Sequence, residues 1–259
     1  MSETLQLLGE DHPRFGEVHV VAQAAGRTAG AISAGGDGPY GAAIFKADLA
    51  VPNEDAGGAR DEGEATLLVV ADGHHGHRAS HALVRRALAL GVPSDPLELL
   101  ASLRHLAGRD GAPDASASTL LLAVCDRRRG RGFGVSFGDS TLSRFRRGAQ
   151  PTVISRKDDR YVAPWAPASL DPRRAQEFEF DAPPGSLIVA YSDGVDECCY
   201  GAPERSLGLG DLADVLERLD AADAETPRLF TEQLARRALR GLQPDAGGQD
   251  NLTIVATRA

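Results

Sequence analysis

The predicted architecture rests on Thr66-Leu67-Leu68-Val69-Val70-Ala71-Asp72-Gly73-His74, an apolar segment that ends in an acid, a glycine and a histidine. Residues 66–71 are too few to span a membrane and are rich in branched side chains, so they predict a strand that is buried on both faces. Such a strand carries Asp72 to the rim of a sheet. There the Asp72 carboxylate and the Gly73 carbonyl are hard oxygen ligands of the kind that Mg²⁺ and Ca²⁺ prefer.

The same pattern recurs elsewhere in the chain. Residues 186–192 run into Asp193-Gly194, residues 133–138 run into Asp139-Ser140, and Asp250 precedes the apolar segment 252–256. A single Asp-Gly pair is ordinary turn chemistry. Four acids at strand ends need a common explanation, because carboxylates gathered at one rim repel each other unless a divalent cation neutralises them.

Hydrophobic periodicity and turn signals predict the remaining elements. Strands are expected over 17–22, 41–47, 118–125, 132–137, 142–147, 152–155 and 252–256, and helices over 77–90, 96–107 with Asp95 as N-cap, 212–219 and 226–242. The proline-rich segment 156–185 is expected to be irregular, and Asp126–Arg131 is read as a charged hairpin tip. This order predicts a layered sandwich of two β-sheets between helices.

Composition bounds the class of protein. The chain has 259 residues, is 42% hydrophobic and carries a net charge of −9, with a sequence pI near 5.3. We therefore expect one domain over 1–259, no nucleic acid as the main partner and no membrane span. Three cysteines do not make a disulfide framework, and with no secretory signal at the start we expect a cytoplasmic protein.

Five motifs in order carry a family resemblance. They are Asn53-Glu54-Asp55-Ala56, Val70-Ala71-Asp72-Gly73-His74, Gly138-Asp139-Ser140, Ser192-Asp193-Gly194 and Gly248-Gln249-Asp250-Asn251-Leu252-Thr253. Over about residues 40–257 the chain resembles the metal-dependent type 2C (PPM) serine/threonine protein phosphatases of the bacterial type. The family's α+β fold is a four-layer αββα sandwich, with two mostly antiparallel sheets flanked by helix pairs, which agrees with the layer order read from periodicity.

The resemblance implies a role for each matching position. Asp72 would bridge two manganese or magnesium ions, and the Gly73 carbonyl would bind one of them. Asp193 and Asp250 would complete the coordination of the first ion, and Glu54 would hold the second. Asp139 matches the position that contributes to a weaker third metal in bacterial members. Asp55 would orient a bound water, and His74 would be the general acid.

The chemistry expected of this set is hydrolysis of phosphoserine and phosphothreonine. Two hard cations can convert a shared water to a bridging hydroxide at neutral pH and neutralise the phosphoryl group that it attacks. His74 would then protonate the leaving alkoxide. A phosphoprotein is the expected substrate and a serine/threonine kinase an expected partner class.

Two alternatives stay open at this stage. The family usually has an arginine four residues before the metal glutamate, where it grips phosphate, and here Ala50 holds that position, with Lys46, Arg14 or Arg27 as candidate replacements. Because of this substitution, a second interpretation stays open, in which the protein is a weakly active or inactive regulatory binding module. The His77/His81 pair has the i, i+4 spacing of a zinc site and suggests a zinc-dependent hydrolase, although no further ligand has suitable spacing in the sequence.

Overall fold

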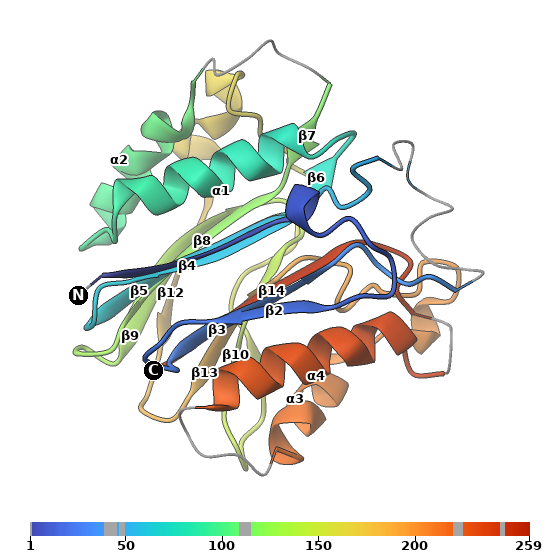
Figure 1. The fold of residues 1–259 in the computed structure, drawn as a ribbon. Helices are drawn as coiled ribbons and strands as arrows, with labels where there is room; N and C mark the ends of the chain where they lie inside the picture. Colours follow the sequence, from blue (N-terminus) through green and yellow to red (C-terminus); the bar gives the residue numbers. More distant parts are fainter. Residues whose placement is uncertain (1, 39–45, 47–49, 109–114, 220–224, 244–246) are drawn as a thin grey trace.

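Strand Ala65–Ala71 (β5) lies in the middle of a sheet with both faces covered, in a computed structural model that describes residues 2–38, 46, 50–108, 115–219, 225–243 and 247–259 (Figure 1). Its side chains alternate between two cores. Leu67 and Val69 face the helices on the outside of the sheet, and Leu68 and Val70 face the second sheet. The prediction of a strand buried on both faces is confirmed.

Two antiparallel sheets of six strands each form the centre of the molecule. The first has the order β1 (Glu3–Leu8), β4 (Ala56–Asp61), β5, β8 (Leu120–Asp126), β9 (Arg131–Phe137) and β12 (Gln176–Asp181). The second has the order β11 (Thr152–Val153), β10 (Thr141–Phe145), β13 (Leu187–Tyr191), β14 (Leu252–Arg258), β3 (Thr28–Ser33) and β2 (His19–Ala22). A short ladder joins β6 (Gly73–His74) to β7 (Ala117–Ser118).

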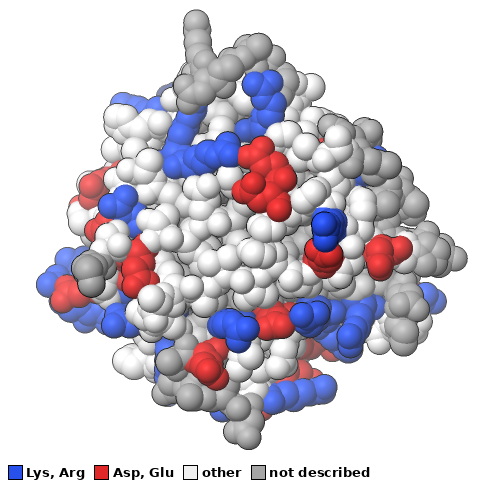
Figure 2. Space-filling view, in the orientation of Figure 1, with Lys and Arg blue, Asp and Glu red and all other residues white. Residues whose placement is uncertain are grey.

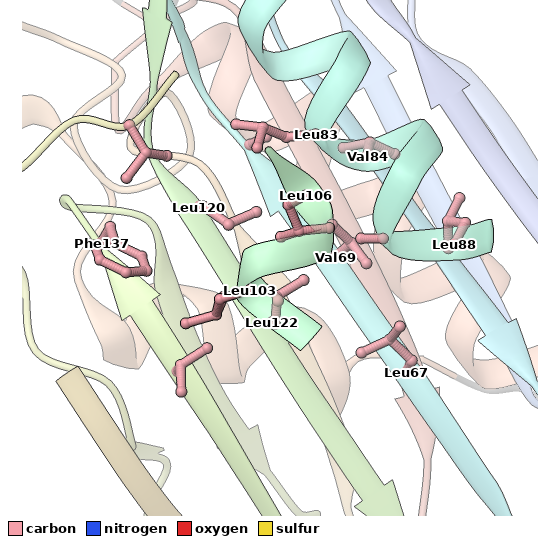
Figure 3. Packing of buried hydrophobic residues seen from close by; sticks show 14 of the residues in the cluster. Leu67, Val69, Leu83, Val84, Leu88, Leu103, Leu106, Leu120, Leu122 and Phe137 are labelled. Carbon is pink, nitrogen blue, oxygen red and sulfur yellow. The ribbon is translucent and has the colours of Figure 1, made fainter. Parts of the chain in front are cut away.

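Two pairs of helices cover the outer faces (Figure 1). Helices α1 (Arg78–Leu90) and α2 (Pro96–Leu106) pack on the first sheet, and α3 (Leu209–Glu217) and α4 (Thr226–Arg240) pack on the second. Figure 3 shows the outer core of the first sheet, where Leu83 and Val84 of α1 and Leu103 and Leu106 of α2 meet Val69. The predicted α+β sandwich of four layers is confirmed.

The helix ends follow local rules. Asp95 is the N-cap of α2 as predicted, because its carboxylate accepts a hydrogen bond from the Glu98 backbone N–H at 2.9 Å and Pro96 occupies the first turn. The other three helices begin and end within a few residues of the expected bounds. The hairpin tip between β8 and β9 is also where it was expected, and Arg127 ties it down through Asp61 at 2.7 Å.

The prediction of irregular chain over 156–185 is wrong for residues 176–181. They form β12 at the edge of the first sheet, paired with β9, so that Phe178 and Phe180 lie across from Gly134 and Gly132. A Cβ atom on Gly134 would come within 2.3 Å of the Phe178 ring, so the glycines make room for the aromatic side chains. The five prolines of the segment concealed a short alternation of acidic and aromatic residues.

Other differences concern strands. β1, β3 and β4 were not predicted, and the strand expected over 17–22 begins at His19. The strand expected over 41–47 lies outside the described residues except for Lys46, which is not in a strand. Figure 2 shows basic and acidic side chains interspersed on the face that it presents. In the described part of the chain no helix is both long and apolar enough to cross a membrane, and the cytoplasmic location stays a prediction.

Candidate metal centre

The four predicted acids all lie at chain positions next to strand ends. Asp72 directly follows β5, Asp139 and Asp193 each follow their strands by two residues, and Asp250 precedes β14 by two. Because β5 and β9 belong to one sheet and β13 to the other, this end of the sandwich gathers acids from both sheets. Ligand oxygens of Asp72, Asp139 and Asp193 come within 4.8 Å of one another.

Three of these carboxylates carry an oxygen that has no hydrogen-bond donor among the described residues. The atoms are Asp72 Oδ2, Asp139 Oδ1 and Asp193 Oδ1, and all three are buried. Burial, with repulsion from Asp250 next, raises the pKa of Asp193 to about 7. Burial, with repulsion from Asp193 next, raises the pKa of Asp72 well above its ordinary value. Such oxygens need either protons or a cation, and hard divalent cations suit this donor set.

Glu54 and Asp55 reach the same region from the segment before β4. The Asn251 side chain accepts a hydrogen bond from the Glu54 backbone N–H at 2.8 Å and donates one to the Ala34 carbonyl at 2.9 Å. The fully buried Asp55 carboxylate accepts a hydrogen bond from the Ser192 hydroxyl at 2.7 Å. Burial, followed by repulsion from Asp250, raises the pKa of Asp55 to about 7. The residue after Asp250 and the residue before Asp193 therefore fix the position of the Glu54 segment.

The glycines of the two Asp-Gly pairs are needed for close backbone packing. A Cβ atom on Gly73 would lie 2.1 Å from the Glu54 carbonyl oxygen, and one on Gly194 would lie 1.9 Å from that of Asn251. Neither glycine has a positive φ. Their role in this structure is to let the acid-bearing segments pass next to each other, rather than to make a sharp turn.

Two side chains that contact the acids were not placed there by sequence reasoning. The sequence suggests Lys46 only as a replacement for the arginine, yet its ammonium lies 2.8 Å from Asp250 Oδ1 and 3.7 Å from Glu54 Oε2. The Tyr200 hydroxyl lies 3.0 Å from Asp193 Oδ2 and also contacts Asp250. Tyr200 follows Asp193 by seven residues in an irregular segment, so no periodicity could have indicated it.

The three basic residues that could replace the missing phosphate-binding arginine at position 50 lie in different parts of the structure. Arg14 pairs with Glu17 in solvent, and Arg27 donates to the Gly63 carbonyl, in the turn between β4 and β5 that lies far from residue 72 along β5. Ala50 is exposed. Of the three basic residues considered, Lys46 is the one at the acids.

His74 lies beside the acids with an unusual neighbour. Its Nε2 is 3.7 Å from Asp72 Oδ1, and its ring meets that of Tyr161 edge on, with centroids 4.3 Å apart. Burial lowers the pKa of His74 in spite of Asp250, which raises it. The next residue, His75, has a φ of 61°, a left-handed conformation that L-residues seldom adopt.

Comparisons with known proteins agree with this geometry. The family model described as "Stage II sporulation protein E" matches residues 65–259. Among solved structures, the catalytic domain of the serine/threonine phosphatase PstP in complex with two manganese ions is 19% identical, with a TM-score of 0.62 over 93% of this chain and 99% of that one. PppA of Pseudomonas aeruginosa is 23% identical, with a TM-score of 0.56 over 90% and 97% of the two chains.

The Mycobacterium tuberculosis phosphatase PstP/Ppp is 18% identical, again with a TM-score of 0.56 and coverage of 90% and 97%. No curated protein sequence matches the chain. At these identities the solved structures establish the fold, and the family model, which spans well over half of the chain, establishes the family. The chain belongs to the stage II sporulation protein E family, within the bacterial metal-dependent type 2C (PPM) phosphatases.

Proposed function

We propose that the protein is a metal-dependent phosphatase that hydrolyses phosphoserine and phosphothreonine in proteins, and that residues 1–259 form one phosphatase domain. The observation that carries the proposal is a set of three carboxylates from both sheets whose oxygens come within 4.8 Å of one another, and each of which has a buried oxygen without a donor among the described residues. Their negative charge is the feature that a bound divalent cation would neutralise.

The proposed ligands follow from this placement. Asp72, Asp193 and Asp250 would hold one manganese or magnesium ion, Glu54 and Asp72 a second, and Asp139 a weaker third. The Gly73 carbonyl would bind one of the first two ions. When bound, these ions would supply an acidified water at neutral pH and charge neutralisation for the phosphoryl group. Hard carboxylate and carbonyl oxygens suit both metals, so we propose manganese or magnesium without preference between them.

The chain's own residues would do the remaining work. Asp55, held by Ser192, would accept a hydrogen bond from a water and orient it. His74 would give its proton to the leaving alkoxide, and burial lowers its pKa, which favours release of the proton. Lys46, at the acids, is the proposed contact for a substrate phosphate, as a point charge rather than the two-pronged grip of an arginine.

One observation favours the second candidate function, a weakly active or inactive regulatory module. The ion pairs of Lys46 with Asp250 and Glu54 place a permanent cation among the proposed metal ligands. A protein that used this fold for binding a phosphoprotein partner would tolerate such a cation. In either role we propose a phosphoprotein as the partner, and a serine/threonine kinase is one class of phosphoprotein that would fit.

The experiment is hydrolysis of p-nitrophenyl phosphate and of a phosphothreonine peptide with manganese, with magnesium and with chelator. Wild type is compared with Asp72→Asn and Asp193→Asn, and with Asp181→Asn at an exposed strand position as the matched control. Metal-dependent turnover that is lost in the first two variants and kept in the control supports the phosphatase. Wild-type protein that binds manganese but hydrolyses neither substrate supports the regulatory module instead.

A further inference from the structure

A second group of potential metal ligands lies on the outer side of the first sheet, away from the converging carboxylates. Glu10, in the short helical turn η1 (Gly9–Asp11), faces His77 and His81 at the start of α1; Figure 1 shows this blue turn beside the beginning of α1. Glu10 Oε2 is 3.8 Å from His77 Nε2, and Glu10 Oε1 is 3.6 Å from His81 Nδ1. Glu10 is therefore a third potential ligand for the histidine pair, although it lies 67 residues before His77 in the sequence.

His81 is the strongest indication that the group binds something. Its side chain is 1% exposed, and its Nδ1 has no hydrogen-bond partner among the described residues. Its other ring nitrogen, Nε2, lies 3.2 Å from the Asp55 carbonyl oxygen and is also within reach of the Gly9 backbone N–H, which can donate to it at 3.1 Å. The Gly9 N–H also donates to the Asp55 carbonyl at 3.0 Å, so it does not depend on His81 as an acceptor.

This arrangement accommodates the tautomer that metal binding through Nδ1 requires. With the proton on Nε2, His81 donates to the Asp55 carbonyl, and the lone pair on the buried Nδ1 points toward Glu10. Histidines that bind metals nearly always donate their second ring N–H to a carboxylate or a backbone carbonyl, which fixes the ring. His81 already has that partner.

We propose that Glu10, His77 and His81 form a separate metal site that binds Zn²⁺. Two imidazoles and one carboxylate are a recognised zinc ligand set, and a zinc site of three protein ligands is completed by water. Tetrahedral ligands at the usual Zn–N distance of about 2.0–2.1 Å lie about 3.3 Å apart. The Glu10–histidine distances of 3.6 and 3.8 Å are close to this separation, and ligand atoms of all three residues lie within 4.8 Å of one another. An adjoining cavity of about 320 Å³, lined also by Pro164 and Trp165, has room for the water.

The charged neighbour that must move is Arg85. Its guanidinium contacts Glu10 Oε1, and its side chain is half exposed, so it can turn to solvent when zinc takes the carboxylate. The ligands differ in kind from the proposed phosphatase centre. Imidazole nitrogen favours zinc, whereas a set of carboxylates and a carbonyl favours magnesium or manganese.

His81 connects this site to the segment that carries Glu54 and Asp55. Zinc on Nδ1 would fix the His81 N–H toward the Asp55 carbonyl, and Asp55 follows Glu54 in the segment that approaches the other acids. The proposed zinc site would therefore stabilise this segment from the side of α1. The binding of zinc itself does not rest on the proposed phosphatase activity.

The test is zinc binding in the presence of millimolar magnesium, measured by equilibrium dialysis and by X-ray absorption at the zinc edge. Wild type is compared with His77→Gln and Glu10→Gln, both at partly exposed positions, and with His105→Gln on the exposed side of α2 as the matched control. Asp193→Asn is included because it alters the carboxylate centre alone. Thermal unfolding with and without zinc is recorded for each protein.

In wild type, His105→Gln and Asp193→Asn we expect one zinc with two imidazole ligands and a rise in Tm on zinc addition. In His77→Gln and Glu10→Gln this zinc should bind at least about 100-fold more weakly, because loss of a direct ligand costs more than the 10–100-fold of a supporting partner. The proposal is overturned if wild-type zinc shows no imidazole scattering, or if His77→Gln retains wild-type zinc affinity. Loss of imidazole-bound zinc in Asp193→Asn would also overturn it, since the ion would then belong to the carboxylates.

Discussion

Replacing Lys46 by methionine should tighten manganese binding, because Lys46 competes with the metal for the same carboxylates. Its ammonium is 2.8 Å from Asp250 and 3.7 Å from Glu54, and its side chain is only 10% exposed. At an effective dielectric constant of about 20, a 2.8 Å pair has a gross attraction of roughly 6 kcal/mol. Desolvation of the ammonium offsets much of this, which leaves about 1.5–3 kcal/mol for the metal to overcome.

That free energy corresponds to a decrease in the manganese Kd of about 10- to 150-fold. The assay is calorimetric titration of chelator-treated protein with manganese. Lys157→Met is the matched control, because Lys157 is the chain's other lysine and pairs with Asp196 at 2.9 Å and Glu197 at 2.6 Å instead. Manganese affinity in the control should stay close to that of wild type.

The same substitution separates two roles of Lys46. If the lysine also contacts the substrate phosphate, Lys46→Met will raise KM for a phosphopeptide while it lowers the Kd for manganese. If the lysine only occupies the metal region, kcat/KM at low manganese will rise. An unchanged or higher manganese Kd in Lys46→Met, or an equal effect in Lys157→Met, would refute the view that Lys46 competes with the ion.

Three further outcomes are expected. His75→Gly should raise the free energy of unfolding by about 0.5–1 kcal/mol in chemical denaturation. The left-handed backbone costs an L-residue about 1–2 kcal/mol, and the greater entropy of glycine in the unfolded chain offsets part of this gain. A loss of stability would mean that contacts of the His75 side chain stabilise the protein by more than the backbone conformation costs. Gly73→Ala should lower both Tm and manganese affinity, because the added Cβ atom would lie 2.1 Å from the Glu54 carbonyl oxygen. Gly210→Ala, in open space on α3, should instead stabilise the protein by about 0.5–1 kcal/mol. The same change in Tm in both variants would contradict the close packing at Gly73. The Tm of metal-free protein should fall as pH rises from 5 to 8, because folding raises the Asp193 pKa from 3.8 to about 7. The protonated Asp193 stabilises the fold fully below its unfolded-state pKa, and this stabilisation is lost as the pH rises through its folded-state pKa. Asp193→Asn and saturating manganese should each reduce the fall in Tm, and an equal dependence of Tm on pH in wild type, in the variant and with manganese would contradict this explanation.

The sequence was sufficient for the layers because the signals for them are local and repeated. Residues 67–71 are all apolar and so supply both faces of the strand, and helix α2 begins at an Asp-Pro pair whose capping chemistry is contained in four residues. The edge strand β12 was missed because its alternation becomes meaningful only beside Gly132 and Gly134 of a partner strand. Pairing across the sheet supplies the space that the local pattern cannot show.

The candidate site divides in the same way. Asp72, Asp139, Asp193 and Asp250 could be proposed because each stands at the end of an apolar segment, and strand ends meet at a rim. Tyr200 could not, because an irregular segment brings it back to the acids without any period. The third ligand for His77 and His81 was hidden for another reason, since Glu10 reaches them only when β1 and α1 lie on the same sheet.

The carboxylate centre and the proposed zinc site both contact the short segment Glu54-Asp55. The position of this segment therefore affects the manganese affinity of the carboxylate centre. Asn251 binds the Glu54 backbone from the side of the second sheet, while Ser80 and His81 of α1 contact the carbonyls of Glu54 and Asp55. A shift of α1 relative to the second sheet would therefore move Glu54 relative to Asp250, and Lys46 lies between those two carboxylates. Since a carboxylate pair binds a divalent ion only at a suitable separation, an ion held by Glu10, His77 and His81 would change manganese affinity through the position of α1 rather than through charge.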